Sequence, residues 1–275
     1  MKSLLFECDF EEFNLPLDFG EEISERLMIE KTDEGMRRLL ELIKRHEIKT
    51  TFFVTEKIAE IYPDLLRRLT AEGHEIGLHP SINYKKDINP NEIINSLRHI
   101  KEKIEHKLKT KIYGFKNHKL ILLPAYIIRE AGFVYDNTCH PTYVPGRYFY
   151  FFKSRKVTIQ DGIINIPISV TPIFRLPFSW IWFRNLGLNY VKFCASQVLL
   201  KQEYINMYIH AWDLVDINDI SGLRLPYLVK NNTGQKMEQL LDRFFRWCKI
   251  KGVNTETIYN YLMNKNYILS GSKDS

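Results

Sequence analysis

The sequence predicts a single-domain α/β fold built on parallel strands. Short apolar segments alternate with amphipathic segments over most of the 275 residues, and repeated strand–helix units place parallel strands side by side. Apolar residues make up 45% of the chain and charged residues 26%, which excludes disordered, collagen-like and coiled-coil proteins. We find no linker or repeat, and we expect one domain over residues 1–269 and a flexible tail over 270–275. The alternation alone fits a barrel and a doubly wound sheet equally well.

Strands are expected where β-branched and aromatic residues cluster. Residues 4–8 predict a buried strand that runs into an acidic cluster, and residues 50–54 (Thr-Thr-Phe-Phe-Val) predict a second strand. Four further strands are expected at 75–78, 112–115, 163–170 and 206–210.

Helices are expected where apolar residues recur every three to four positions. Residues 32–46 show this spacing, with Thr32 as the expected N-cap. Residues 62–72 have Pro63 in the first turn and Gly73 just past the end, as helices commonly do. The other expected helices cover 89–107, 124–131, 236–249 and 255–263.

Composition and charge exclude several classes of function. The four cysteines lie far apart without a Cys-x-x-Cys pair, which argues against a zinc ribbon and fits a reducing compartment. Acidic residues begin at Glu7, too early for a signal peptide, and no apolar stretch approaches about 18 residues. The net charge of +6 is mild and no nucleic-acid motif is present. We therefore expect a cytoplasmic protein that does not bind nucleic acid.

Polar side chains follow the predicted strands at the points where the strands end. Ligands bind at the carboxyl ends of parallel strands, so these side chains are expected at one rim. Each of them alone is more often a cap or a surface group than a catalyst, but their convergence favours a functional site. They are Asp9, Glu11 and Glu12 after the first strand, His79 after the third, Lys116 after the fourth, and His210, Trp212 and Asp213 after the last.

The order and spacing of several motifs resemble the NodB-homology polysaccharide deacetylases, carbohydrate esterase family 4. The most specific block runs from Phe-Phe-Val at 52–54 to Gly-His-Glu-Ile-Gly-Leu-His at 73–79. Supporting similarities are Gly-Phe-Lys at 114–116, Ala-Gly-Phe-Val-Tyr-Asp-Asn-Thr at 131–138, Ile-Pro-Ile-Ser at 166–169, Arg-Leu-Pro-Phe-Ser at 175–179 and His-Ala-Trp-Asp at 210–213. The resemblance covers nearly the whole chain.

This resemblance implies a distorted (β/α) barrel of about seven strands and a metal-dependent hydrolase. The expected reaction removes an N-acetyl or N-formyl group from an amino sugar in a polysaccharide or a lipid-linked glycan. Family members hold a divalent ion with one carboxylate and two histidines, and zinc is the expected ion. A second carboxylate accepts a proton from water, and the histidine of the last motif protonates the leaving amine.

Carried onto this chain, the resemblance makes Asp9 the general base and Glu11 the carboxylate ligand. Glu12 is an alternative ligand, and the sequence does not choose between them. His79 matches the first histidine ligand. Asn83 stands where the second is expected, and an amide oxygen binds zinc less well than imidazole.

Three consequences of Asn83 are open from the sequence. The metal is weakly held or is a harder ion, another histidine such as His118 or His140 takes its place, or no metal binds. Loop histidines are mostly exposed, and we expect this of both candidates.

Lys116 stands where the family has an arginine that orients the base. It keeps the positive charge but loses the planar fork, and we expect it to hold Asp9 ionised. His210 matches the general acid, and Asp213 could orient its ring. The resemblance further implies that Asp136, Trp212 and Asp213 contact the substrate.

The region 174–193 is rich in aromatic residues and carries only Arg175, Arg184 and Lys192 as charges. Core packing is the simplest interpretation. A sharper one is peripheral contact with the inner face of a membrane, where a lipid-linked saccharide would be bound.

Two other functions fit the altered motifs. One is a metal-independent amide or ureide hydrolase similar to the allantoinase-type relatives, using Glu11, His79 and His210. The other is a carbohydrate-binding pseudoenzyme, against which the retention of Asp9, Glu11, His79 and His210 argues.

Overall fold

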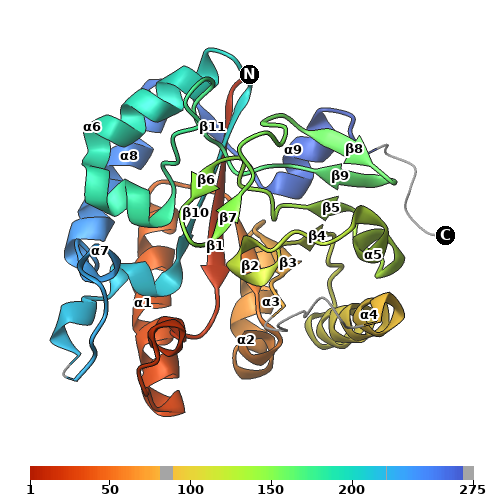
Figure 1. Cartoon of the computed structure of the whole chain (residues 1–275), viewed down its shortest axis with the longest axis horizontal. Coiled ribbons are helices and arrows are strands. Elements are labelled where there is room, and N and C mark those ends of the chain that lie inside the picture. The colour runs from red at the N-terminus through yellow and green to blue at the C-terminus, as the bar shows by residue number, and fades with distance from the viewer. Residues whose placement is uncertain (81–88, 221, 269–275) are drawn as a thin grey trace.

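The computed structural model describes residues 1–80, 89–220 and 222–268, and it shows a curled, mostly parallel sheet surrounded by helices (Figure 1). In spatial order the strands are β10 (Tyr204–His210), β1 (Ser3–Phe10), β2 (Thr50–Val54), β3 (Glu75–Leu78), β4 (Gly114–Phe115), β5 (Tyr135–Asp136), β9 (Ile163–Asn165) and β8 (Thr158–Gln160). The seven strands from β10 to β9 are parallel, and β8 is antiparallel to β9. The predicted α/β fold with about seven parallel strands is confirmed.

Helices pack around the outside of this sheet, and shorter elements complete it. The helices are α1 (Glu25–Arg45), α2 (Glu56–Ile61), α3 (Pro63–Ala71), α4 (Pro90–Leu108), α5 (Ala125–Glu130), α6 (Trp180–Leu199), α7 (Tyr227–Lys230), α8 (Gln235–Ile250) and α9 (Ile258–Asn264). The 3-10 helices are η1 (Leu15–Phe19), η2 (His118–Leu120), η3 (Ala211–Leu214) and η4 (Ile217–Asp219). Strand β11 (Asn254–Thr255) pairs with β1, while β6 (Tyr143–Val144) and β7 (Tyr148–Phe149) form a separate hairpin.

In strand β1, alternate side chains point to opposite faces of the sheet, and the polar ones share one face. Every residue of β1 is buried. Leu4, Phe6, Cys8 and Phe10 pack in the core that contains the apolar faces of the helices. Leu5 packs in the smaller cluster inside the barrel. Successive side chains of a strand point to opposite faces, so the same alternation directs Glu7 and Asp9 into the barrel interior.

The segment after β9 closes the barrel against β10. The Ser169 amide donates to the Asn206 carbonyl at 2.8 Å, and the Asn206 amide donates to Ser169 Oγ at 2.9 Å. The predicted strand over 163–170 is therefore too long, because Pro167 cannot donate a ladder hydrogen bond and the ladder ends at Asn165. The predicted strand over 112–115 likewise shortens to Gly114–Phe115.

The prediction that Thr32 caps a helix is wrong. Helix α1 begins at Glu25, and Ser24 is its N-cap. Thr32 lies in the middle of α1, where its hydroxyl accepts from the Phe13 amide at 2.9 Å and lies 2.9 Å from the Met28 carbonyl oxygen. Its polar group thus fixes the loop that follows β1, next to the acidic cluster.

Three helices, α2, α6 and the short α7, lie outside the helices expected from the sequence. Helix α6 has apolar residues on most of its faces and contains Gly187 at φ 78°, so the regular helical pattern is lost. It packs against β10 and α8. Within the described residues, no helix is long and apolar enough to cross a membrane.

Candidate active site

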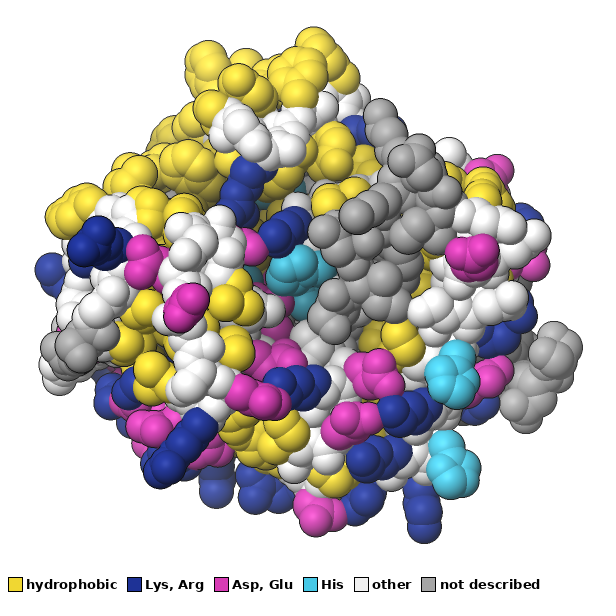
Figure 2. All heavy atoms as spheres, turned by 60° about the horizontal axis from the view of Figure 1, so that its bottom comes forward, with side chains coloured by type: hydrophobic (Ala, Val, Ile, Leu, Met, Phe, Trp, Pro, Cys, Tyr) yellow, Lys and Arg dark blue, Asp and Glu magenta, His cyan; other side chains and the backbone are white. Residues whose placement is uncertain are grey.

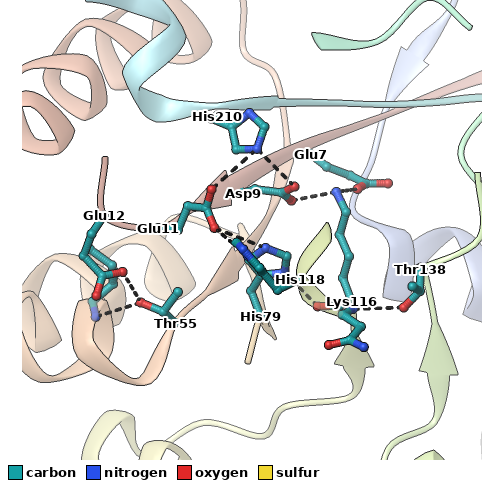
Figure 3. A network of polar contacts seen from close by, with 12 residues as sticks. Glu7, Asp9, Glu11, Glu12, Thr55, His79, Lys116, His118, Thr138 and His210 are labelled. Atoms are coloured by element: carbon teal, nitrogen blue, oxygen red, sulfur yellow. Dashed lines mark hydrogen bonds and ion pairs between the residues drawn. The ribbon is translucent and has the colours of Figure 1, made fainter. Parts of the chain in front are cut away.

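Charged side chains from four parallel strands and the loops after them meet at one end of the barrel (Figure 3). Glu7 and Asp9 come from β1, and Glu11 directly follows it. His79 follows β3, Lys116 follows β4, and His210 ends β10. The predicted convergence at the carboxyl ends of the strands is therefore found, although the chemical roles of these residues stay predictions.

Glu11, His79 and His118 form a compact set of potential metal ligands. Glu11 Oε2 lies 3.2 Å from His118 Nδ1 and 3.5 Å from His79 Nε2, and the three ligand atoms lie within 4.8 Å of one another. Ligands at about 2.0–2.1 Å from a tetrahedral ion are roughly 3.4 Å apart. This spacing therefore suits a small divalent cation.

The protonation of His79 is set by its surroundings. Its Nδ1 lies 2.7 Å from the carbonyl oxygen of Lys116, which can only accept, so Nδ1 carries the proton. Nε2 is thereby left facing Glu11 in the manner usual for metal-binding histidines. Burial lowers the pKa of His79, but the nearby carboxylates of Asp9 and Glu11 have a larger opposite effect. The pKa of His79 is therefore raised above its ordinary value.

Glu11 is buried at 4% exposure, and its Oε2 has no hydrogen-bond partner within the described residues. Burial raises its pKa, but the neighbouring histidines overcome this effect and hold that pKa well below its usual range. A buried, ionised and unsatisfied carboxylate oxygen between two imidazoles fits a cation. Glu11, His79 and His118 are thus the residues that would hold one.

Glu12 points elsewhere, because its Oε2 accepts from the Thr55 hydroxyl at 2.8 Å. Of the two carboxylates left open by the sequence, the structure puts Glu11 beside the histidines. Asn83, the expected third ligand, lies outside the described residues.

The expectation of exposed loop histidines is wrong at both His118 and His140. The His118 side chain is 25% exposed and faces Glu11, whereas His140 is buried and its Nδ1 lies 2.8 Å from the Tyr148 hydroxyl. His118 lies on η2, two residues after Lys116, and it is one of the two histidines named above as substitutes for Asn83. His140 is not part of the ligand set.

Lys116 forms a buried ion-pair network with two carboxylates. Its Nζ donates to Asp9 Oδ1 at 2.6 Å and to Glu7 Oε2 at 2.9 Å, and it lies 4.0 Å from the centre of the Tyr208 ring. Burial raises the pKa of Glu7 to about 7, a rise that Lys116 opposes. Burial lowers the pKa of Lys116, but the negative charges of Asp9 and Glu7 have a larger opposite effect. The pKa of Lys116 is therefore raised above its ordinary value. Sequence analysis missed Glu7, although an acid two residues before Asp9 in a buried strand must share its face.

His210 faces both carboxylates of the site. Its Nε2 lies 3.6 Å from Glu11 Oε1 and 3.9 Å from Asp9 Oδ2. The Trp212 ring stacks on the imidazole with centroids 4.6 Å apart. On the other side of the ring, Nδ1 lies 3.5 Å from Asp213 Oδ2, which also accepts from the His210 amide at 2.9 Å.

Asp213 is held by a buried arginine that the sequence did not single out for this role. Arg184 Nε lies 3.1 Å from Asp213 Oδ1, and neither side chain is exposed. Burial lowers the pKa of Arg184, and Asp213 opposes that shift. The structure therefore gives Asp213 the position of an orienting group for His210.

A cavity of about 600 Å³ opens onto these residues. Trp212 lines it, as expected of a substrate-binding residue, but neither Asp136 nor Asp213 belongs to its lining. Asp136 instead accepts from the Thr138 amide at 2.8 Å, and burial raises its pKa to about 6. Both carboxylates contact protein groups, and their contacts with a substrate stay predictions. The polar and aromatic walls of the cavity include Asp9, Glu11, His79, His118, His140, Arg147, Tyr148, Trp180, Trp182, Tyr208 and His210.

His140 should make the fold sensitive to acid. Burial lowers its pKa from 6.5 to about 3, so between these values the folded state binds fewer protons than the unfolded state. Stability is therefore lost as the pH falls below about 6.5, by about 2 kcal/mol at pH 5. We expect His140→Gln to weaken this dependence in urea unfolding measured at about pH 7.5 and about pH 5.

The matched control for this prediction is His99→Gln, because His99 is an exposed histidine of α4. It should leave the pH dependence of unfolding unchanged. If His140→Gln retained the full wild-type dependence, the acid sensitivity would have to come from other groups.

Comparison with known proteins finds similarity to polysaccharide deacetylases in part of the chain. Residues 27–116 match the family model described as polysaccharide deacetylase. A segment of 61 residues is 36% identical to the peptidoglycan-N-acetylglucosamine deacetylase of Bacillus cereus, covering 22% of each chain. Over these segments the chain is similar to polysaccharide deacetylases. In this match the chain spans about a fifth of the length of that curated relative.

Several solved structures share the fold of this chain. Puue allantoinase matches with a TM-score of 0.61 and 17% identity, over 94% of this chain and 88% of that one. A pseudoenzyme of carbohydrate esterase family 4 from Bacillus anthracis matches with a TM-score of 0.52 and 14% identity, over 95% of this chain and 66% of that one. These likenesses support the predicted NodB-like barrel. The part of the chain matched by the family model includes His79 and Lys116 but not Asp9, Glu11 or His210.

Proposed function

We propose that the protein is a metal-dependent hydrolase that removes an N-acetyl or N-formyl group from an amino sugar of a glycan or lipid-linked glycan. One observation carries this proposal: a carboxylate paired with a cation, a three-residue ligand set and a histidine meet in one cavity. The relative from Bacillus cereus, whose name gives peptidoglycan N-acetylglucosamine as its substrate, supports the sugar class.

The distances between these residues support a separate chemical role for each of them. A divalent ion held by Glu11, His79 and His118, with zinc the expected one, would polarise the acyl carbonyl and acidify a water molecule. Asp9, paired with Lys116 at 2.6 Å, accepts the proton of the attacking water. His210, held by Asp213 and stacked on Trp212, donates a proton to the departing sugar nitrogen.

The cavity walls suit a sugar. Trp180 and Trp182 from the start of α6 and Tyr148 from β7 contribute aromatic surface to it. Rings of this kind can stack against the apolar face of a pyranose while polar groups at the cavity floor orient the acyl group. Arg147 lies 5.6 Å from the Trp180 ring at the same wall and adds a positive charge.

The test is release of acetate or formate from N-acylated sugars. We expect the zinc- or cobalt-loaded protein to release acetate from N-acetylglucosamine oligomers or formate from N-formylated analogues. Asp9→Asn should lower kcat/KM by about 10²–10⁴-fold. Glu12→Gln is the matched control, because its carboxylate bonds to Thr55 outside the ligand set.

Two results would contradict the proposal. Turnover of allantoin without release of either acid would favour the ureide hydrolase. Glycan binding without hydrolysis of any substrate would favour the carbohydrate-binding pseudoenzyme.

A further inference from the structure

An exposed cluster of apolar side chains lies on the hairpin β6–β7 and the loop before α6. We define this aromatic rim as Tyr143, Phe149, Phe151, Phe152, Ile173 and Phe174. Four of its rings, those of Tyr143, Phe149, Phe151 and Phe152, contact one another, and with Phe174 these line a shallow depression. Phe152 is 82% exposed, Ile173 76% and Phe174 74%. Large apolar side chains are rarely this exposed together unless they bind something.

The hairpin connects this rim to the candidate active site. Tyr143 pairs with Phe149 and Val144 pairs with Tyr148. Val144 and Tyr148 line the cavity, whereas Tyr143 and Phe149 line the depression of the rim. One face of the hairpin therefore lines the cavity, and the other face forms part of the exposed rim.

Apolar surface continues around the cavity mouth. Leu186 of α6 and Leu228 of α7 line the cavity and are 50% and 58% exposed. Figure 2 shows hydrophobic side chains gathered along the upper and left margins of the hollowed face. The rim is thus one part of a larger apolar border beside the site.

The part of the sequence that contains the rim is rich in positive charge. From residue 137 to residue 202 it has eight lysines and arginines and a single acidic residue, Asp161, although Arg184 of this set is buried and paired with Asp213. The whole chain has a net charge of only +6, so the basic excess is concentrated in this region. Arg147, Lys153 and Lys156 are exposed there, and the Arg175 guanidinium lies 5.7 Å from the Phe151 ring.

We propose that the aromatic rim docks the protein on an anionic phospholipid bilayer, with the cavity mouth at the lipid surface. Exposed aromatic rings that enter the headgroup region, flanked by lysine and arginine with hardly any carboxylate, match the chemistry of such a surface. The near absence of acidic residues is charge complementarity to lipid phosphates. Docking does not depend on the proposed reaction, because it is measured without substrate.

The test is co-sedimentation with vesicles of phosphatidylcholine alone and vesicles containing about one third phosphatidylglycerol. We expect the wild-type chain to bind the anionic vesicles and to be released by salt. The triple variant Phe149→Ser, Phe152→Ser and Phe174→Ser should bind at least about tenfold less. The double variant Lys153→Gln and Lys156→Gln should bind less and lose part of the salt dependence.

Control variants keep the test decisive. Ile250→Ser removes an apolar side chain that is 82% exposed at the end of α8, and it should bind vesicles like the wild type. If the triple variant fails to fold, the single variant Phe152→Ser replaces it in the vesicle assay. Hydrolysis of a soluble substrate should be unchanged in all of these variants, which separates failure of docking from failure of the proposed reaction.

Three results would overturn the proposal. The first is that the wild type binds neither vesicle type at low salt. The second is that the rim variants bind vesicles as well as Ile250→Ser does. Light scattering that showed a dimer dissociated by the rim variants, without vesicle binding, would assign the rim to a second copy of the chain.

Discussion

Replacement of His118 by alanine is expected to remove a divalent ion from the protein. The reconstituted wild type should hold about one ion per chain, because Glu11, His79 and His118 form a three-residue ligand set. Loss of one imidazole leaves two protein ligands, and we expect the affinity for zinc to fall by at least about a hundredfold. Elemental mass spectrometry after dialysis, with competitive zinc titration, measures both quantities.

Matched variants separate the possible ligand sets. His79→Ala should lose the ion as His118→Ala does. His140→Ala should keep it, because His140 lines the same cavity but contacts Tyr148. Asn83→Ala tests the ligand expected from the family pattern.

Two outcomes would contradict the His118 ligand set. One is loss of the ion in Asn83→Ala but not in His118→Ala, which would restore the ligand expected from the motif. The other is the absence of any ion in the wild type even after reconstitution, which would leave the metal-dependent mechanism without support.

Elements with a strong local pattern could be predicted from the sequence. Residues 50–54 and 75–78 are strands with the bounds expected. β-Branched and aromatic residues mark the first, Ile76 and Leu78 mark the second, and a polar residue follows each directly. Helix α6 could not be predicted in the same way. Its apolar residues occupy most faces of the helix, including the exposed positions Leu186 and Phe193, and periodicity therefore carries little information.

Some residues of the candidate site could be predicted from the sequence and others could not. Asp9, His79 and His210 could be located because each follows a recognisable strand. His118, Glu7 and Arg184 act through contacts with residues 107, 109 and 29 positions away in the chain. Such contacts depend on strand register and helix packing, which no local pattern in one sequence specifies.

Replacement of Lys116 by methionine is expected to destabilise the fold more than any other single change in the site. Lys116 is fully buried and is the cation that Asp9 and Glu7 both contact. Removal of one partner of a buried ion pair typically costs about 3–5 kcal/mol, because the remaining charge is left uncompensated. Urea unfolding at about pH 8 would measure this loss.

The loss should depend on pH in a defined direction. The pKa of Glu7 is already raised from 4.5 to about 7 in the folded protein, and removal of Lys116 takes away the charge that opposes this rise. The folded state then binds more protons than the unfolded state above about pH 4.5, so stability falls as the pH rises. Lys116→Met should accordingly be less destabilised at about pH 5 than at about pH 8.

A second substitution makes the test specific to the carboxylates. Glu7→Gln in the Lys116→Met background should recover part of the lost stability, since one buried carboxylate is neutralised. Asp9 also loses the Lys116 contact that positions its carboxylate toward the water, so kcat/KM should stay about 10²-fold or more below the wild type even where stability is recovered. Equal destabilisation at both pH values, or no recovery by Glu7→Gln, would mean that Lys116 stabilises the barrel by packing against Tyr208 and Phe53 and not through its charge.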